Sequence, residues 1–201
     1  MQILYQDKHL IVINKPSGLL SQPGSIKDSV HSRLQAQFPF VGLIHRLDQA
    51  TSGIMVLALT QLALSSIAKQ FQDRQTFKVY EARVFGRIPA KQGNVNLPLR
   101  CDWPNRPRQE VHSEGRQSIT YWRLMAIEGN CSRVELIPHT GRSHQLRVHM
   151  KAMGFPMVGD YFYAHDEALN LSKRLHLHAK TLRINHPMTQ QAMTFSCQAP
   201  F

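Results

Sequence analysis

The chain has 201 residues, enough for one domain with a sizeable core or for two small lobes. It carries 24 Lys and Arg against 13 Asp and Glu, a formal net charge of +11, which is typical of proteins that bind a polyanion such as nucleic acid. The three widely spaced cysteines form no Cys-x-x-Cys pair, and no apolar run nears the about 18 residues of a membrane span. The N-terminus lacks a signal-peptide pattern, so we expect a cytoplasmic protein with no membrane contact.

The first part of the chain predicts a strand and a short helix. Residues 10–13, Leu-Ile-Val-Ile, indicate a strand that a turn ends at residues 14–18. Lys15 in this turn is either a phosphate contact or a solvated lysine. Residues 25–38 predict an amphipathic helix, because Val30, Leu34 and Phe38 recur every four residues and a proline follows.

A loop of mixed charge comes next, with the sequence His45-Arg46-Leu47-Asp48-Gln49-Ala50-Thr51-Ser52-Gly53. The continuous apolar run at residues 54–59 predicts a buried strand directly after it. Asp48 would therefore lie in a loop attached to a rigid strand, where catalytic groups are often held. The alternative is a surface ion pair or a turn cap.

Residues 60–86 predict a helix followed by a strand. Thr60 can cap the helix, and Leu64, Ile67, Ala68 and Phe71 have the spacing of a core-facing stripe. Residues 77–86 alternate like a strand that contains Tyr80. A tyrosine in a strand is usually a packed aromatic residue.

Residues 97–109 contain three prolines, and we expect no regular element there. Arg100, Arg106 and Arg108 surround Trp103 in this segment. Arginines interleaved with an aromatic residue suit RNA, because they offer phosphate contacts and a stacking face together. A surface loop with incidental arginines is the alternative.

The last third predicts a hairpin from residues 119–127 and 131–138, and then a helix that Thr140 or Ser143 caps and Gly154 ends. His139, His144 and His149 are five residues apart, a step of about 140° around a helix. They therefore do not share a face, and we expect no metal site there. Residues 175–179 alternate like a strand with His176 and His178 on its polar face, and a last hairpin turns at residues 186–191.

Four blocks of this chain resemble the pseudouridine synthases of the RluA family. The loop at residues 45–53 is similar to the family signature His-Arg-Leu-Asp-x-x-Thr-Ser-Gly, and residues 5–18, the strand around Tyr80 and residues 140–149 match three further blocks. The resemblance implies an α+β fold with a central mixed or antiparallel sheet, flanking helices and a basic RNA-binding cleft. It also implies one catalytic domain over residues 1–201, without an S4 domain.

The resemblance assigns roles to individual residues. It implies that Asp48 is catalytic, that Tyr80 stacks on the target base, and that an arginine pairs with Asp48; Arg147 is our candidate and Arg142 the competitor. Arg46 would fill the gap that the flipped uridine leaves. His45 would support the loop or contact the RNA backbone.

Isomerisation of uridine needs no cofactor and no metal, and Asp48 could attack the sugar, add to the uracil ring or abstract the 2′ proton. Residues 97–109, with their core Cys-Asp-Trp-Pro-Asn-Arg-Pro, resemble those of family members that modify both tRNA and 23S rRNA, which implies uridine 32 of the tRNA anticodon loop and uridine 746 of 23S rRNA as targets. Alternatives are a tRNA-only or rRNA-only relative, or a non-catalytic RNA-binding protein. We expect a monomer.

Overall fold

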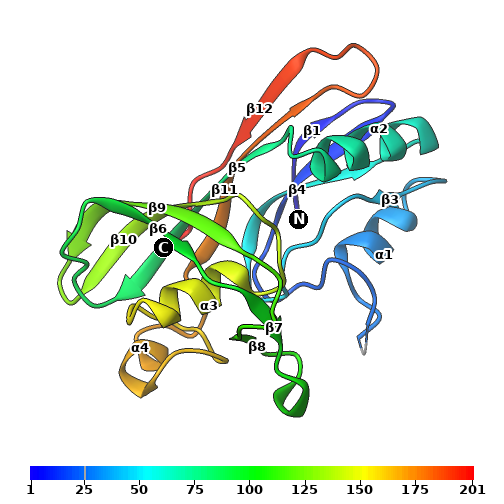
Figure 1. Ribbon diagram of the computed structural model, residues 1–201. Helices are drawn as coiled ribbons and strands as arrows, with labels where there is room; N and C mark the ends of the chain where they lie inside the picture. The colour runs from blue at the N-terminus through cyan, green and yellow to red at the C-terminus, as the bar shows by residue number, and fades with distance from the viewer. Residues whose placement is uncertain (25) are drawn as a thin grey trace. The chain divides into compact units, whose positions relative to one another are not determined.

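The structure is a computed structural model that describes residues 1–24 and 26–201 (Figure 1). Its contacts divide the chain into two compact units. Unit 1 contains residues 1–78 and 178–200, and unit 2 contains residues 79–177 together with Phe201. The chain leaves unit 1 within β5 (Phe77–Phe85) and returns to it within β11 (Leu177–Asn185).

Unit 1 is built on buried strands. β2 (Leu10–Lys15) pairs antiparallel with both β1 (Gln2–Gln6) and β4 (Ser52–Ala58), and the short β3 (Gly42–Leu43) also pairs with β4. β4 runs parallel to β11, and β12 (Ala192–Ser196) forms an antiparallel hairpin with β11. The sheet is therefore mixed, as the resemblance implied. Every residue of β4 is buried, which confirms the strand that the apolar run predicted.

Two helices belong to unit 1. α2 (Gln61–Gln72) begins where Thr60 accepts a hydrogen bond from the Ala63 N–H, as expected, and Ile67 packs into the core with residues of β2, β4 and β11. α1 (Val30–Gln35) is shorter than the predicted 25–38, because Ser29 and Ser32 form a capping box that starts the helix at Val30. Ser25 lies outside the described residues.

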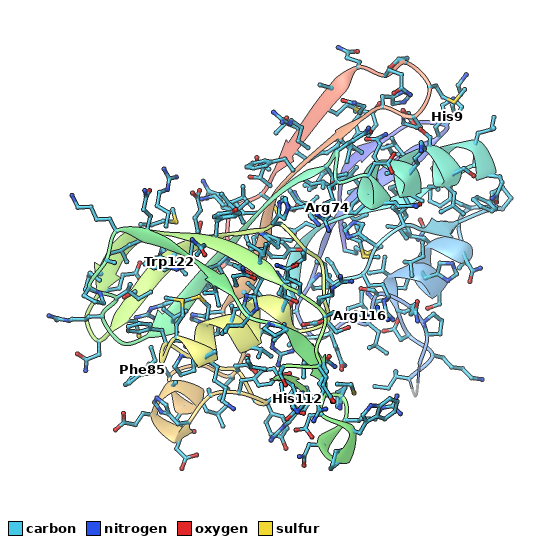
Figure 2. The ribbon with its side chains drawn as sticks, viewed as in Figure 1. His9, Arg74, Phe85, His112, Arg116 and Trp122 are labelled. Atoms are coloured by element: carbon cyan, nitrogen blue, oxygen red, sulfur yellow. The ribbon has the colours of Figure 1, made fainter. Side chains whose placement is uncertain are left out.

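Unit 2 contains an antiparallel sheet in which β5, β10 (Cys131–Pro138), β9 (Ile119–Glu128) and β6 (Gln92–Asn96) are neighbours in that order. The β9–β10 hairpin confirms the prediction. β6 was not predicted, because its sequence Gln-Gly-Asn-Val-Asn has low strand propensity. It pairs with β9, where Gly93 lies directly against the ring of Trp122, the residue labelled in Figure 2.

The expectation of an irregular segment at residues 97–109 was wrong. β7 (Leu99–Cys101) and β8 (Gln109–Val111) form an antiparallel hairpin, and a 3-10 turn, η1 (Trp103–Asn105), lies at its tip. The three prolines lie before β7 or within the tip, so both strands keep their backbone donors. The chain after β8 supports the hairpin through His112 and Arg116, whose N–H groups donate to Pro98 and Leu99 (Figure 2).

The remaining helices of unit 2 are α3 (Gln145–Ala152) and α4 (Asp166–Asn170). The predicted caps of α3, Thr140 and Ser143, were wrong: the residue at the N-cap is His144, which makes no side-chain capping bond. His176 and His178 are both buried, so their placement on a polar face was also wrong. Among the described residues no helix is long and apolar enough to cross a membrane.

Candidate active site

The loop that carries Asp48 is fixed on both sides of that residue. Leu47 is buried, and its N–H and C=O both hydrogen-bond to the hydroxyl of Ser21, at 3.0 and 2.7 Å. On the other side, the Thr51 N–H donates to the carbonyl of Asp48 at 3.1 Å and closes a turn. The half-buried carboxylate of Asp48 therefore projects from a backbone that has little freedom to move.

Lys15 also holds this loop in place through hydrogen bonds. Its side chain is fully buried, and its Nζ donates to the carbonyls of Leu19, Pro16 and Gln49 at 2.7, 3.0 and 3.1 Å. Gln49 directly follows Asp48. The expectation that Lys15 contacts phosphate or is solvated was therefore wrong. A buried ammonium with carbonyl acceptors fixes backbone, and this role was not visible in the sequence because it depends on residues 34 positions apart.

The end of the loop explains why the motif closes with Ser-Gly. Gly53 has φ +116°, and a Cβ at this position would lie 2.3 Å from the carbonyl oxygen of Ala179 in the parallel strand β11. Only glycine fits there. Ser52, beside it, hydrogen-bonds to the buried Nδ1 of His178 at 2.8 Å. The motif residues 52 and 53 thus join the loop to the sheet.

His45 and Arg46 have different environments. The Val56 N–H donates to His45 Nε2 at 3.1 Å, and the imidazole stacks on Phe71 with ring centroids 4.8 Å apart. Burial, together with the positive charge of Lys78, lowers the pKa of His45 to about 3, so the ring is a neutral acceptor. These contacts favour loop support over RNA contact. The side chain of Arg46 is exposed.

In unit 2, Arg147 projects from α3 into a buried site. Its side chain is 3% exposed and pairs with the fully buried Asp160 through two bonds, Nε to Oδ2 at 2.9 Å and Nη2 to Oδ1 at 2.6 Å. The rings of Phe162 and Tyr163 lie over the guanidinium, with centroids 5.3 and 5.0 Å from its Cζ. Arg142, by contrast, has an exposed side chain.

A buried polar network fixes α3 and its arginine. Gln145 Oε1 accepts from the Thr140 hydroxyl at 2.8 Å and from the Arg142 N–H at 3.0 Å, and its Nε2 donates to the Thr120 hydroxyl at 3.0 Å. His149 continues the network to Thr120 and to the carbonyl of Leu97, at 2.9 and 3.2 Å. Burial lowers the pKa of His149, which keeps its ring neutral. Sequence reasoning missed this network, although all but Thr120 and Leu97 lie in one motif.

Tyr80 lies in the middle of β5, opposite Leu136 of β10, and is half-buried. Its neighbour Glu81 is buried and pairs with Arg133, whose pKa is raised by hydrogen bonds to Glu128 and Glu81. The strand that holds Tyr80 is therefore well fixed on the side of β10.

The four hairpin residues predicted to bind RNA have three kinds of environment. Arg100 pairs with Glu110 and Glu114 at 2.8 and 3.0 Å, so its charge is largely compensated. Trp103 is 68% exposed, and the guanidinium of Arg106 lies over its ring at 4.6 Å. Arg108 lies over Phe162 at 5.8 Å. In the described part of the chain, no group of three or more His, Cys, Asp or Glu side chains could hold a metal ion.

Residues 9–152 match the family described as RNA pseudouridylate synthase. The chain belongs to this family. It is 51% identical to the "Dual-specificity RNA pseudouridine synthase RluA" of Yersinia pestis over 100% of both chains. It is 50% identical to the protein of that name in Salmonella typhi, over 99% of this chain and 93% of the relative.

The fold is that of solved pseudouridine synthases. The human protein "RNA Pseudouridylate Synthase Domain Containing 1" superposes with a TM-score of 0.86 at 28% identity, covering 100% of this chain and 84% of that one. The α+β fold with a mixed sheet is thereby confirmed. The range that matches the family includes Asp48, Tyr80 and Arg147 but ends before Asp160.

Proposed function

We propose that this protein is a dual-specificity RNA pseudouridine synthase that converts uridine to pseudouridine in the tRNA anticodon loop and in a loop of 23S rRNA. The observation that carries the proposal is the loop of Asp48, in which the residues on both sides of the carboxylate are fixed by Ser21 and Lys15. The names of the 51% and 50% identical relatives support the dual specificity.

The reaction breaks the bond from N1 of uracil to C1′ of the sugar and forms a bond from C5 to the same C1′. N1 gains a proton, the C5 proton is lost to solvent, and no net oxidation occurs, so no cofactor is required. The leaving uracil is stabilised by its own carbonyls and stays in the site, which makes a second carboxylic acid less necessary than in glycosidases. Asp48 acts on the sugar or on the base as nucleophile, or on the 2′ proton as base.

The roles of the other residues follow the family resemblance. Arg147 is the proposed partner of the Asp48 carboxylate, with Arg142 as the alternative; Asp160 binds the Nε and Nη2 edge of Arg147 and fixes the plane of its guanidinium. Tyr80 is the proposed stacking partner of the target base. The exposed Arg46 has the length and charge to fill the gap left by the flipped uridine.

RNA recognition is proposed to rely on the hairpin tip and a basic cleft. Trp103 and Arg106 form an exposed stacked pair that suits an unpaired base and a phosphate. Arg108 adds a charge near Phe162, and Arg100 contributes through the shape of the hairpin. The two units are proposed to act as one catalytic domain and as a monomer, in the cytoplasm where tRNA and ribosomes are found.

The test uses tRNA and a 23S rRNA fragment transcribed with uridine tritiated at C5. Wild type is expected to release tritium into water from both RNAs, and Asp48→Asn is expected to release none while it still binds RNA. The matched control is Asp166→Asn, an exposed carboxylate in α4, which should keep full activity. Release from only one RNA would restrict the substrate to that RNA. Absence of release with salt-sensitive binding would favour a non-catalytic RNA-binding protein.

A further inference from the structure

Tyr163 contacts both the β7–β8 hairpin and the helix that carries Arg147. The side chain is 5% exposed and shares a small core with Leu99 of β7 and Val148 of α3, against which Phe162 packs. Buried tyrosines usually hydrogen-bond through their hydroxyl. Here that hydroxyl joins the two elements.

The hydroxyl of Tyr163 accepts a hydrogen bond from the Gln109 N–H at 2.8 Å and lies 2.6 Å from His144 Nδ1. Gln109 is the first residue of β8 and pairs with Cys101, so the contact holds the hairpin where its tip begins. His144 directly precedes α3. Tyr163 therefore connects the base of the tip that carries Trp103 to the start of α3.

His144 has an unusual backbone conformation at this contact. Its φ is +53°, in the left-handed region that residues other than glycine rarely adopt, and its side chain makes no bond to the helix N-terminus. Its ring instead lies edge-on to Tyr163, with centroids 5.5 Å apart, and is stacked with Phe162 at 5.7 Å. Such a conformation persists only where the surroundings fix it, and it is often found at functional sites.

The same two aromatic rings hold cations from both elements. The Arg147 guanidinium lies 5.0 Å from the Tyr163 ring and 5.3 Å from the Phe162 ring. The Arg108 guanidinium, from the hairpin, lies 5.8 Å from the Phe162 ring. A shift of the hairpin that moves Gln109 or Arg108 would therefore displace the aromatic rings that pack against the Arg147 guanidinium.

We propose that Tyr163, together with His144, is a positioning residue that couples RNA binding at the hairpin tip to the placement of Arg147. The proposal rests on the proposed function, because it assumes that the hairpin binds RNA and that Arg147 serves Asp48. RNA that fixes the hairpin then also fixes the Tyr163 ring and the arginine packed on it. The loss of this contact should therefore lower the rate through a misplaced Arg147 and should weaken RNA binding by loosening the hairpin.

The test is a double-mutant cycle between Tyr163→Phe and Arg106→Ala, with RNA affinity and the single-turnover rate at saturating RNA as readouts. Tyr163→Phe keeps the ring but removes the hydroxyl, and we expect the rate to fall about tenfold. Arg106→Ala should lower affinity about tenfold and the rate about threefold in wild type, but should not lower the rate further in Tyr163→Phe. Tyr161→Phe, which removes the hydroxyl of a residue that is 77% exposed, is the matched control and should leave the rate unchanged.

Rate effects that simply multiply in the double variant would overturn the coupling and reduce Tyr163 to a structural residue. A second pair of variants separates the hydrogen bond from the backbone. His144→Gly relieves the positive φ and removes the imidazole, whereas His144→Ala removes the imidazole alone. Both should lower the rate if the bond to Tyr163 matters, and a wild-type rate in His144→Gly would contradict the proposal. An inactive wild type would instead refute the proposed function.

Discussion

The buried pair of Arg147 and Asp160 makes the most quantitative prediction. Asp160→Asn keeps the shape of the side chain but removes the charge that balances Arg147 in a site where the two side chains are 3% and 0% exposed. Charge-assisted hydrogen bonds contribute about 1.5–3 kcal/mol each, and two are weakened here. Removal of one partner from a buried ion pair costs about 3–5 kcal/mol, which agrees with that sum.

For a chain of this size, 1 kcal/mol shifts Tm by roughly 2–4 °C, so the loss should lower Tm by about 6–20 °C. Thermal unfolding followed by circular dichroism at pH 7 measures the shift. The matched control is Asp28→Asn, because Asp28 accepts two bonds from Arg33 with the same geometry, at 2.7 Å each, but on the exposed surface. No measurable change is expected there. A Tm for Asp160→Asn within 2 °C of wild type would show that the buried pair is not the anchor of Arg147.

Three further predictions test the loop, the buried histidine and the hairpin. Gly53→Ala should abolish stable folding of unit 1, since the new Cβ would lie 2.3 Å from the Ala179 carbonyl, and soluble expression with a wild-type Tm would contradict the close approach. His176 stacks on Phe201, and its buried Nδ1 has no hydrogen-bond partner among the described residues. Burial lowers the pKa of His176 from 6.5 to about 4, and Arg83 and other nearby arginines have smaller effects in the same direction. The unfolded chain therefore binds more protons between pH 6.5 and 4, so the stability from this group is complete above pH 6.5 and is lost as pH falls through about 4. His176→Phe should make Tm less sensitive to acid in that window, and an unchanged slope would refute the assignment. Arg106→Ala should weaken RNA binding and reduce the slope of log affinity against log salt by about one, whereas an unchanged slope would remove Arg106 from the interface.

Much of this protein was determined by local sequence. The apolar run at residues 54–59 already indicates a buried strand, and the spacing of the α2 stripe and the cap at Thr60 act within one helix. The motif at residues 45–53 is contiguous, so a single stretch was enough to propose Asp48 as the catalytic residue. The positive net charge likewise needs no structure to indicate a polyanionic partner.

Only the tertiary structure decided which polar residues are buried and with whom they pair. Lys15 binds the carbonyl of Gln49, Arg147 binds Asp160 and Tyr163 binds Gln109, and the members of these pairs are 34, 13 and 54 residues apart. The pairing of β6 with β9 also depends on a distant partner, and the hairpin at residues 99–111 is held by Tyr163 from far along the chain. Periodicity and propensity describe what a segment does alone, whereas a buried charge or a weak strand is stabilised by groups that folding brings to it.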